Sequence, residues 1–169
     1  MSGEDSIRLR PALESDSPRV KEIFSECFNP QYVSHTEIQE GRATAEGFPL
    51  VGAADLLAAE VLRTITDPGR GIMLVAELGT RIVGFAFSGI ETKMGGRYGV
   101  CYDLCVLPEA RRKGVGRSLI TATVSLMETK GVNAVFAESN ISNSPAHGLL
   151  ESLEFRPVST VFAKIVHLY

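Results

Sequence analysis

The sequence predicts an α/β domain built on a mixed β-sheet with helices packed against it. Three observations predict this class. The 169 residues suffice for one core, 44% of them are hydrophobic, and segments with strand-like alternation are interspersed with segments of helical spacing. The strand-helix-strand step over residues 99–139 should be right-handed, with its two strands side by side. We therefore expect residues 1–169 to form a single domain.

The first half of the chain is expected to hold a strand, a helix, a loop and a second helix. Ser17-Pro18 is an N-cap and first-turn pair for the first helix, in which apolar residues recur at helical spacing. The second helix has Leu57, Val61 and Ile65 on one side. The expected ranges are residues 7–10 for the strand, 17–28 for the first helix, 29–51 for the loop and 54–65 for the second helix.

The second half is expected to alternate strands with two further helices. Leu78-Gly79-Thr80 separates two apolar runs, which indicates an antiparallel hairpin. Gly131 ends the longer helix, and a strand follows at once. The expected ranges are residues 72–77 and 81–90 for the hairpin, 99–109 for the next strand, 114–130 for a helix, 133–139 for a strand, 145–153 for a short helix and 158–166 for a last strand.

Composition and charge exclude several classes of protein. The net charge of −3 argues against general nucleic-acid binding. No apolar stretch approaches the ~20 residues of a membrane helix, and the acidic start Met1-Ser-Gly-Glu-Asp-Ser leads into no apolar signal core, so no membrane contact and a cytoplasmic location are expected. The three cysteines lack zinc-type spacing, so we expect buried thiols and no metal.

The segment from Val106 to Leu119, Val-Leu-Pro-Glu-Ala-Arg-Arg-Lys-Gly-Val-Gly-Arg-Ser-Leu, joins an apolar strand to a glycine-opened helix start. Gly114 and Gly116 remove Cβ atoms that would hold a ligand away from the backbone. The first helical turn presents unpaired N–H groups and a partial positive charge, which is an arrangement that binds pyrophosphate. Cationic side chains nearby favour a ligand with several phosphate charges; they are Arg111, Arg112, Lys113 and Arg117.

Two common phosphate loops do not fit this spacing. A Walker A loop would need glycine where Arg111 stands and lysine where Arg117 stands. A dinucleotide fingerprint would need a third glycine at Leu119. The remaining pattern, Arg111-x-x-Gly114-x-Gly116, closely resembles motif A of the GNAT superfamily of N-acetyltransferases, which bind acetyl-CoA.

The resemblance extends over residues 97–157. The strand before the motif ends in Val-Leu-Pro-Glu109, and the segment from Asn143 to Phe155 is similar to the family's Asn-x-x-Ala-x-x-x-Tyr-x-x-x-Gly-Phe, with Leu150 at the tyrosine and Glu154 at the glycine. It implies a mixed, mostly antiparallel sheet of about seven strands with about four flanking helices. The sheet would be splayed between the strand before the motif and the strand after its helix.

The resemblance also implies the reaction and the cofactor contacts. The acetyl group of acetyl-CoA would pass to a primary amine of a small molecule or peptide by direct attack in a ternary complex. A bulge in the strand before the motif would free the amides of Leu104, Cys105 and Val106 for the pantetheine and the thioester oxygen. Asn143 would contact the pantetheine arm, although asparagine is also an ordinary N-cap. The other expected contacts are Arg111, Arg112, Lys113, Gly114, Val115, Gly116, Arg117 and Ser118.

Three side chains are candidates for acid-base catalysis. Glu138 and Asp103 are carboxylates in otherwise apolar strands, where burial would raise their pKa toward the working pH; the alternative is a solvent-facing position. Because Tyr102 alternates with Asp103, only one of the two should face the cleft. In the family the tyrosine is thought to protonate the departing thiolate, which Leu150 cannot do. His147 would substitute for it, or else lie at the surface.

Two other classes of function stay open. Without the tyrosine, the chain would be a non-catalytic acyl-CoA-binding or regulatory domain. Alternatively, the same helix start would bind the phosphates of a nucleotide unrelated to CoA. The sequence does not specify the acceptor, and it is compatible with a homodimer.

Overall fold

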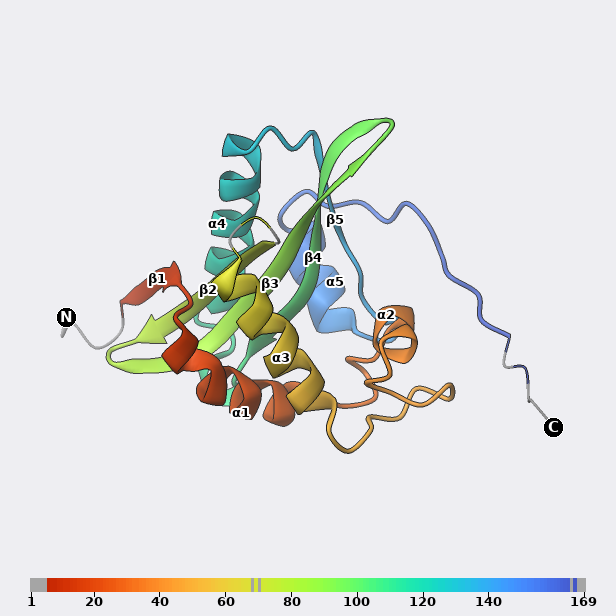
Figure 1. Cartoon of the computed structure of the whole chain (residues 1–169), viewed down its shortest axis with the longest axis horizontal. Coiled ribbons are helices and arrows are strands. Elements are labelled where there is room, and N and C mark those ends of the chain that lie inside the picture. The colour runs from red at the N-terminus through yellow and green to blue at the C-terminus, as the bar shows by residue number, and fades with distance from the viewer. Residues whose placement is uncertain (1–5, 68, 70, 165, 167–169) are drawn as a thin grey trace.

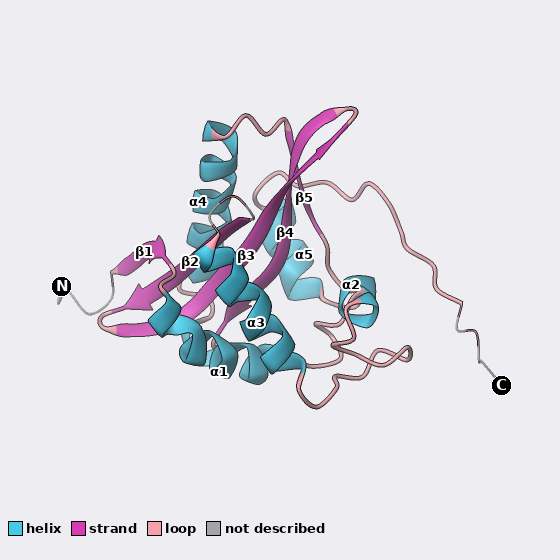
Figure 2. Ribbon diagram, viewed as in Figure 1, coloured by secondary structure: helices cyan, strands magenta, loops and turns pink. Residues whose placement is uncertain are grey.

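A computed structural model of the chain describes residues 6–67, 69, 71–164 and 166. Five strands form one sheet in the order β1-β2-β3-β4-β5. Helices α1 and α3 cover one face of the sheet, and α4 and α5 lie on the other (Figures 1 and 2). The elements are β1 Ile7–Pro11, α1 Ser17–Cys27, α2 His35–Gln39, α3 Ala53–Thr66, β2 Gly71–Leu78, β3 Arg81–Lys93, β4 Gly96–Val106, α4 Val115–Thr129, β5 Ala134–Ala137 and α5 Ser144–Glu151, with short 3-10 turns at Glu14–Asp16 and Pro108–Ala110.

The pairing of the strands creates the opening that the resemblance implied. Strands β1 to β4 pair antiparallel, and β5 pairs parallel to β4. On β4, Cys101 pairs with Ser88 and Asp103 with Phe87, which leaves Tyr102 as an extra residue, a β-bulge. The pairing of β4 with β5 also stops at Cys101. The two strands therefore separate at the bulge, and the expected splay is confirmed.

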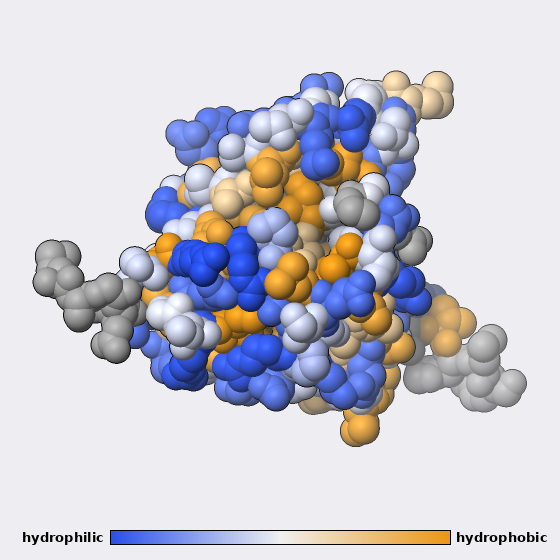
Figure 3. All heavy atoms as spheres, turned by 60° about the vertical axis from the view of Figure 1, so that its left-hand side comes forward, coloured by the Kyte–Doolittle hydropathy of each residue, from blue (hydrophilic) through white to orange (hydrophobic). Residues whose placement is uncertain are grey.

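The core lies between the sheet and its helices, where apolar faces meet. Helix α1 buries Phe24 and Ile23, and α4 buries Leu119 and Met127. A Cβ on Gly99 of β4 would clash with the Met127 sulfur, so this glycine lets α4 approach the strand closely. All three cysteines are buried and free, as predicted. On the face drawn in Figure 3, hydrophilic side chains predominate, with hydrophobic patches between them.

Three expectations about secondary structure were wrong. The sheet has five described strands instead of about seven. The strand expected over residues 158–166 is not formed by residues 158–164 and 166, because no described strand lies beside them to accept their backbone hydrogen bonds. The expected loop over residues 29–51 contains α2, so the described helices number five instead of about four. The N-cap of α1 is Asp16, and Ser17 is already its first residue.

Candidate active site

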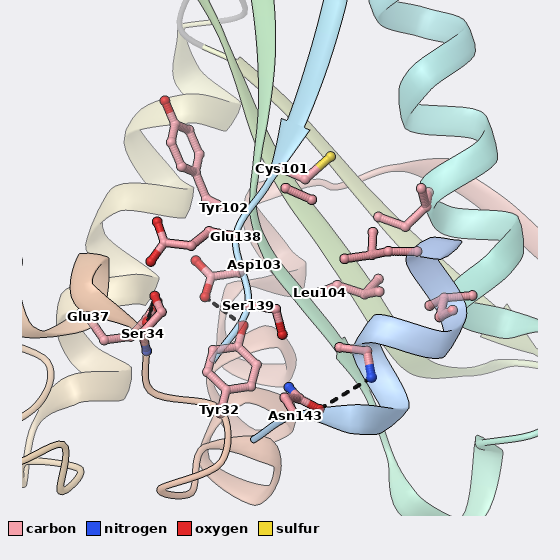
Figure 4. Close-up of a pocket in the computed structure, with 15 residues that line it drawn as sticks. Tyr32, Ser34, Glu37, Cys101, Tyr102, Asp103, Leu104, Glu138, Ser139 and Asn143 are labelled. Carbon is pink, nitrogen blue, oxygen red and sulfur yellow. Dashed lines mark hydrogen bonds between the residues drawn. The ribbon is translucent and has the colours of Figure 1, made fainter. Parts of the chain in front are cut away.

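A cavity lies where β4 and β5 separate, and it draws on segments far apart in the sequence (Figure 4). Its wall includes side chains from the loop before α2, from β4, from the end of β5, and from α4 and α5. Tyr102, Asp103 and Glu138 lie on one side of the separating strands, whereas Leu104 lies toward α5 (Figure 4). The wall of the cavity thus draws on side chains from both faces of the sheet.

The start of α4 has the backbone geometry of an anion site. Gly114 is the N-cap with φ +87°, a left-handed conformation that favours glycine. The first amide of the helix that donates to a backbone carbonyl is that of Ser118, which donates to the Gly114 carbonyl at 2.9 Å. Among the described residues no hydrogen bond engages the amides of Val115, Gly116 and Arg117. These three amides and the helix dipole can therefore receive phosphate oxygens.

Gly116 lets the start of α4 pack closely against α5 and β4. A Cβ at this position would lie 3.2 Å from Leu149 Cδ2 on α5 and 3.8 Å from both Leu104 and Val106 on β4. The glycine thus sits where the helix start faces the gap between β4 and α5. Leu104 and Leu149 also line the cavity at the splay, so the start of α4 lies next to the wall of that cavity.

Of the four cationic side chains of the motif, two are engaged in hydrogen bonds within the protein and two are exposed. Arg111 donates from Nε to the Val106 carbonyl at 2.9 Å and thereby holds the end of β4. Arg117 donates to Ser152 Oγ at 2.8 Å, which joins α4 to the end of α5. Arg112 and Lys113 are exposed in the turn before Gly114. Val115 has its side chain in the core and offers only its amide.

The amides of β4 beyond the bulge differ in direction. Leu107 donates its amide to the Val83 carbonyl at 2.9 Å, toward β3. Since successive N–H groups alternate in direction along a strand, the amide of Cys105 also faces β3, and those of Leu104 and Val106 face the splay. The geometry therefore favours Leu104 and Val106, over Cys105, as donors to a bound thioester or pantetheine.

Asp103 lies in a buried network of charges. It is 2% exposed, it accepts a hydrogen bond from the Tyr32 hydroxyl at 2.7 Å, and it pairs with Arg42 Nη1 at 3.1 Å. Arg42 is itself 3% exposed and also pairs with Glu37 at 3.3 Å and Glu40 at 2.7 Å. A carboxylate held by these donors is better suited to anchoring the loop around Tyr32 than to accepting a proton from substrate.

Tyr102 and Asp103 both line the cavity. The expectation that only one of them would face the cleft was wrong, because it assumed strict alternation along the strand. The bulge at Tyr102 breaks that alternation. The Tyr102 hydroxyl reaches Glu91 on β3 at 3.1 Å, and the ring borders a second cavity between α3 and the sheet.

Glu138 lies just beyond β5 at the mouth of the cavity. Its carboxylate contacts His35 Nδ1 at 2.6 Å and accepts a hydrogen bond from Thr36 Oγ1 at 2.8 Å, both from α2. Partial burial acts to raise the pKa of Glu138, but hydrogen bonds from Ser34 and Thr36 and the nearby His35 outweigh it and lower that pKa. The expected upward shift was wrong in direction, and the group is an ionised carboxylate at neutral pH.

Helix α5 presents Asn143 and Leu150 to the cavity. The Asn143 side chain caps the helix by accepting a hydrogen bond from the Ala146 amide at 3.3 Å, so its role as an N-cap is confirmed. Leu150 supplies an apolar wall. His147 is half-buried and is not among the side chains lining this cavity.

The loop around α2 closes the cavity, which its weak sequence pattern did not predict. Tyr32 reaches β4, His35 and Thr36 reach Glu138, and Asn140 Nδ2 donates to the Val33 carbonyl. One signal was available: Ser34-x-x-Glu37 is a capping box, in which the Ser34 amide donates to Glu37 at 2.6 Å.

Gly116→Asp is expected to weaken CoA binding by more than tenfold, because it adds volume beside Leu149 and a negative charge at the helix start. Calorimetric titration with CoA measures the effect. Gly95→Asp is the matched control, since no heavy atom lies within 4 Å of a Cβ there. Wild-type affinity in Gly116→Asp would contradict the assignment of the cradle.

Residues 18–155 match the model of the family described as "Acetyltransferase (GNAT) family". The chain is 33% identical over 101 residues to a mycothiol acetyltransferase of Arthrobacter sp. (strain FB24), covering 59% of this chain and 31% of that protein. It is 30% identical over 96 residues to an N-alpha-acetyltransferase of Sulfurisphaera tokodaii, covering 52% and 58%. The chain thus spans about a third of the mycothiol acetyltransferases that it matches.

Solved structures share the fold. An aminoglycoside N-acetyltransferase in complex with CoA superposes with a TM-score of 0.70 at 15% identity, covering 96% of each chain. An acetyltransferase of Trypanosoma brucei superposes with a TM-score of 0.63 at 25% identity, covering 95% of this chain and all of the other. In the described part of the chain no helix has the length and apolar character to cross a membrane. No group of three or more His, Cys, Asp or Glu side chains suited to a metal ion occurs there either.

Proposed function

The chain belongs to the acetyltransferase (GNAT) family, and on this premise we propose that it transfers the acetyl group of acetyl-CoA to a primary amine of a small molecule or peptide. The observation that carries the proposal is that the free amides at the start of α4 lie next to the cavity at the splay between β4 and β5, because Gly116 borders Leu104 and Leu149 of the cavity wall. Together they offer a path along which the phosphate, pantetheine and thioester portions of one ligand can lie, and that ligand supplies an activated acetyl carbonyl.

The residues proposed to hold acetyl-CoA follow that path. The amides of Val115, Gly116 and Arg117 bind the pyrophosphate, with Arg112 and Lys113 near enough to add positive charge. The amides of Leu104 and Val106 donate to the pantetheine or the thioester oxygen, where developing negative charge needs stabilisation. The side-chain N–H groups of Asn143 would donate to the pantetheine arm, since its side-chain oxygen already accepts a hydrogen bond from the Ala146 amide.

The acceptor is proposed to arrive from the opposite face, along α3. The cavity on that face is lined by Glu40, Glu60 and Glu91 together with Arg42 and Arg63, and Tyr102 borders both this cavity and the splay. Arg42 pairs with Glu40 and Arg63 with Glu60, whereas Glu91 has no ion pair among the described residues. Its carboxylate would favour the approach of a protonated amine, which is the dominant form of an aliphatic amine at neutral pH. The two faces of the sheet would thus deliver the two substrates to one point for direct attack.

Glu138 is proposed as the group that receives the proton of the acceptor amine. It lines the splay with its carboxylate ionised, and its side chain is 31% exposed, so a substrate can reach it. Asp103 is assigned to positioning instead, because Arg42 and Tyr32 engage its oxygens inside the protein. His35 would hold Glu138 in place from the α2 side.

The direct test mixes acetyl-CoA with a panel of amines and measures free CoA thiol together with the mass of the acetylated product. Steady CoA release that depends on an amine supports the proposal. Binding of CoA without release for any amine would indicate a non-catalytic acyl-CoA-binding domain. Competition by ATP as strong as that by CoA would indicate a nucleotide-phosphate site.

Leu150→Tyr tests whether protonation of the departing thiolate limits turnover. If it does, the phenol added at the cavity wall should raise kcat for acetylation. If His147 already supplies the proton, His147→Ala should lower kcat by about 10²-fold and Leu150→Tyr should change little. Unchanged kcat in both variants, at saturating acceptor, would show that neither position takes part.

A further inference from the structure

One hydroxyl group in the wall of the cavity between β4 and β5 has no partner within the protein. The other hydroxyl groups that line this cavity donate to carboxylates of the chain; they belong to Tyr32, Ser34 and Tyr102. Ser139 also lines the cavity, and its Oγ is buried without a hydrogen-bond partner among the described residues. A buried hydroxyl left unpaired costs free energy, so its place in a cavity wall points to a ligand that supplies the partner.

Ser139 extends to the side of the splay from which CoA is proposed to enter. It directly follows Glu138 beyond the end of β5, and successive side chains of an extended chain point to opposite faces. Figure 4 shows that Glu138 extends toward the α2 side, whereas Ser139 extends the other way, toward Asn143 at the start of α5. The acceptor side of the splay thus has the carboxylate, and the CoA side has the free hydroxyl.

The donors around Ser139 indicate which atom of CoA it meets. The thioester oxygen and the pantetheine amides already have proposed donors in the backbone of β4 and in Asn143. The sulfur has none, because Leu150 is apolar and His147 is not among the side chains that line the cavity. The sulfur also gains negative charge as the acetyl group leaves, and hydrogen bonds to charged acceptors are the stronger ones.

On the premise of the proposed acetyl transfer, we propose that the Ser139 hydroxyl donates a hydrogen bond to the sulfur of CoA as the acetyl group leaves it. The amine nitrogen bonds to the carbonyl carbon, the C–S bond breaks, and the electron pair of that bond leaves on sulfur as the thiolate. One proton of the acceptor ammonium goes to Glu138, and a second passes to water as the intermediate collapses. Ser139 keeps its own proton, and solvent protonates the thiolate after it departs.

The pKa of the thiol of bound CoA tests this contact without requiring turnover. The ultraviolet absorbance of the thiolate measures it in complexes of CoA with the wild-type chain and its variants. Ser139→Ala should raise this pKa by about one unit, because it removes a hydrogen bond to a charged acceptor. Ser139→Thr retains a hydroxyl and should restore the wild-type value. Ser88→Ala, the matched control, removes a buried serine hydroxyl from β3 that lines neither cavity.

Steady-state kinetics separate departure of the thiolate from binding of CoA. At saturating acceptor, kcat of Ser139→Ala should fall by about tenfold or more, since the hydrogen bond forms fully only as charge develops on sulfur. The affinity for CoA at about pH 6, where a thiol of pKa ~8.5 is protonated, should stay within about threefold of the wild type.

The outcomes distinguish this contact from the proposed acetyl transfer. An unchanged thiol pKa in Ser139→Ala would overturn the contact alone, and a lower kcat would then reflect a structural role of the serine. A raised thiol pKa without turnover of any amine would support the contact and refute the acetyl transfer. Failure of the wild-type chain to bind CoA would overturn both.

Discussion

Glu138→Gln is expected to lower kcat/KM for the acceptor amine by about 10²-fold or more, which is the usual contribution of a general base. Glutamine preserves the volume of the side chain and can still accept the hydrogen bond from Thr36 Oγ1. It cannot take a proton from an ammonium group. The loss should therefore appear with the amine substrate, and the affinity for CoA should stay near that of the wild type.

The pH dependence separates a base from a merely structural residue. Because the pKa of Glu138 is lowered from 4.5, its carboxylate stays ionised from about pH 5 upward and can take the proton of the bound ammonium. Wild-type kcat/KM should therefore change little between that pH and the pKa of the acceptor, whereas kcat/KM of Glu138→Gln should rise as the acceptor itself loses its proton. The defect of Glu138→Gln should shrink above the pKa of the acceptor, where the amine is already neutral. Glu109→Gln, at an exposed surface ion pair, is the control. A variant within threefold of wild type at pH 7 would exclude Glu138 as the base.

The parts of the fold predicted correctly are those whose signals are local. The β2–β3 hairpin and the start of α4 follow from alternation, turn glycines and helix-start residues within a few positions of one another. The cradle at Gly114 was predictable for the same reason, since a helix start and its N-cap are specified by one short segment.

The parts predicted wrongly depend on contacts between distant residues. The hydrogen bonds that lower the pKa of Glu138 come from residues about one hundred positions earlier in the chain, so burial alone suggested the opposite direction. Residues 158–164 have the composition of a strand, but strand propensity without a partner creates no ladder. The bulge at Tyr102 shows only in the register against β3.

The loop that closes the active site depends on one buried cation. Arg42 lies within hydrogen-bonding distance of three carboxylates, those of Asp103, Glu37 and Glu40. It thereby joins the loop after α2 to β4. Its guanidinium also lies over the Phe24 ring of α1. Removing one partner of a buried ion pair leaves uncompensated charge in a low dielectric, which costs far more than the pair contributes when it is intact.

Arg42→Met is therefore expected to lower the free energy of unfolding by about 3–5 kcal/mol. At about 2–4 °C per kcal/mol for a chain of this size, the Tm should fall by about 6–20 °C. Methionine keeps the apolar contact with Phe24 and removes only the charge and its hydrogen bonds. The double variant Arg42→Met/Asp103→Asn should be more stable than Arg42→Met alone, because it removes one of the carboxylates left without a counterion. Urea denaturation followed by circular dichroism measures all three proteins. A loss below about 1 kcal/mol in Arg42→Met would mean that water reaches these carboxylates and that the loop is held by Tyr32 and Glu138 instead.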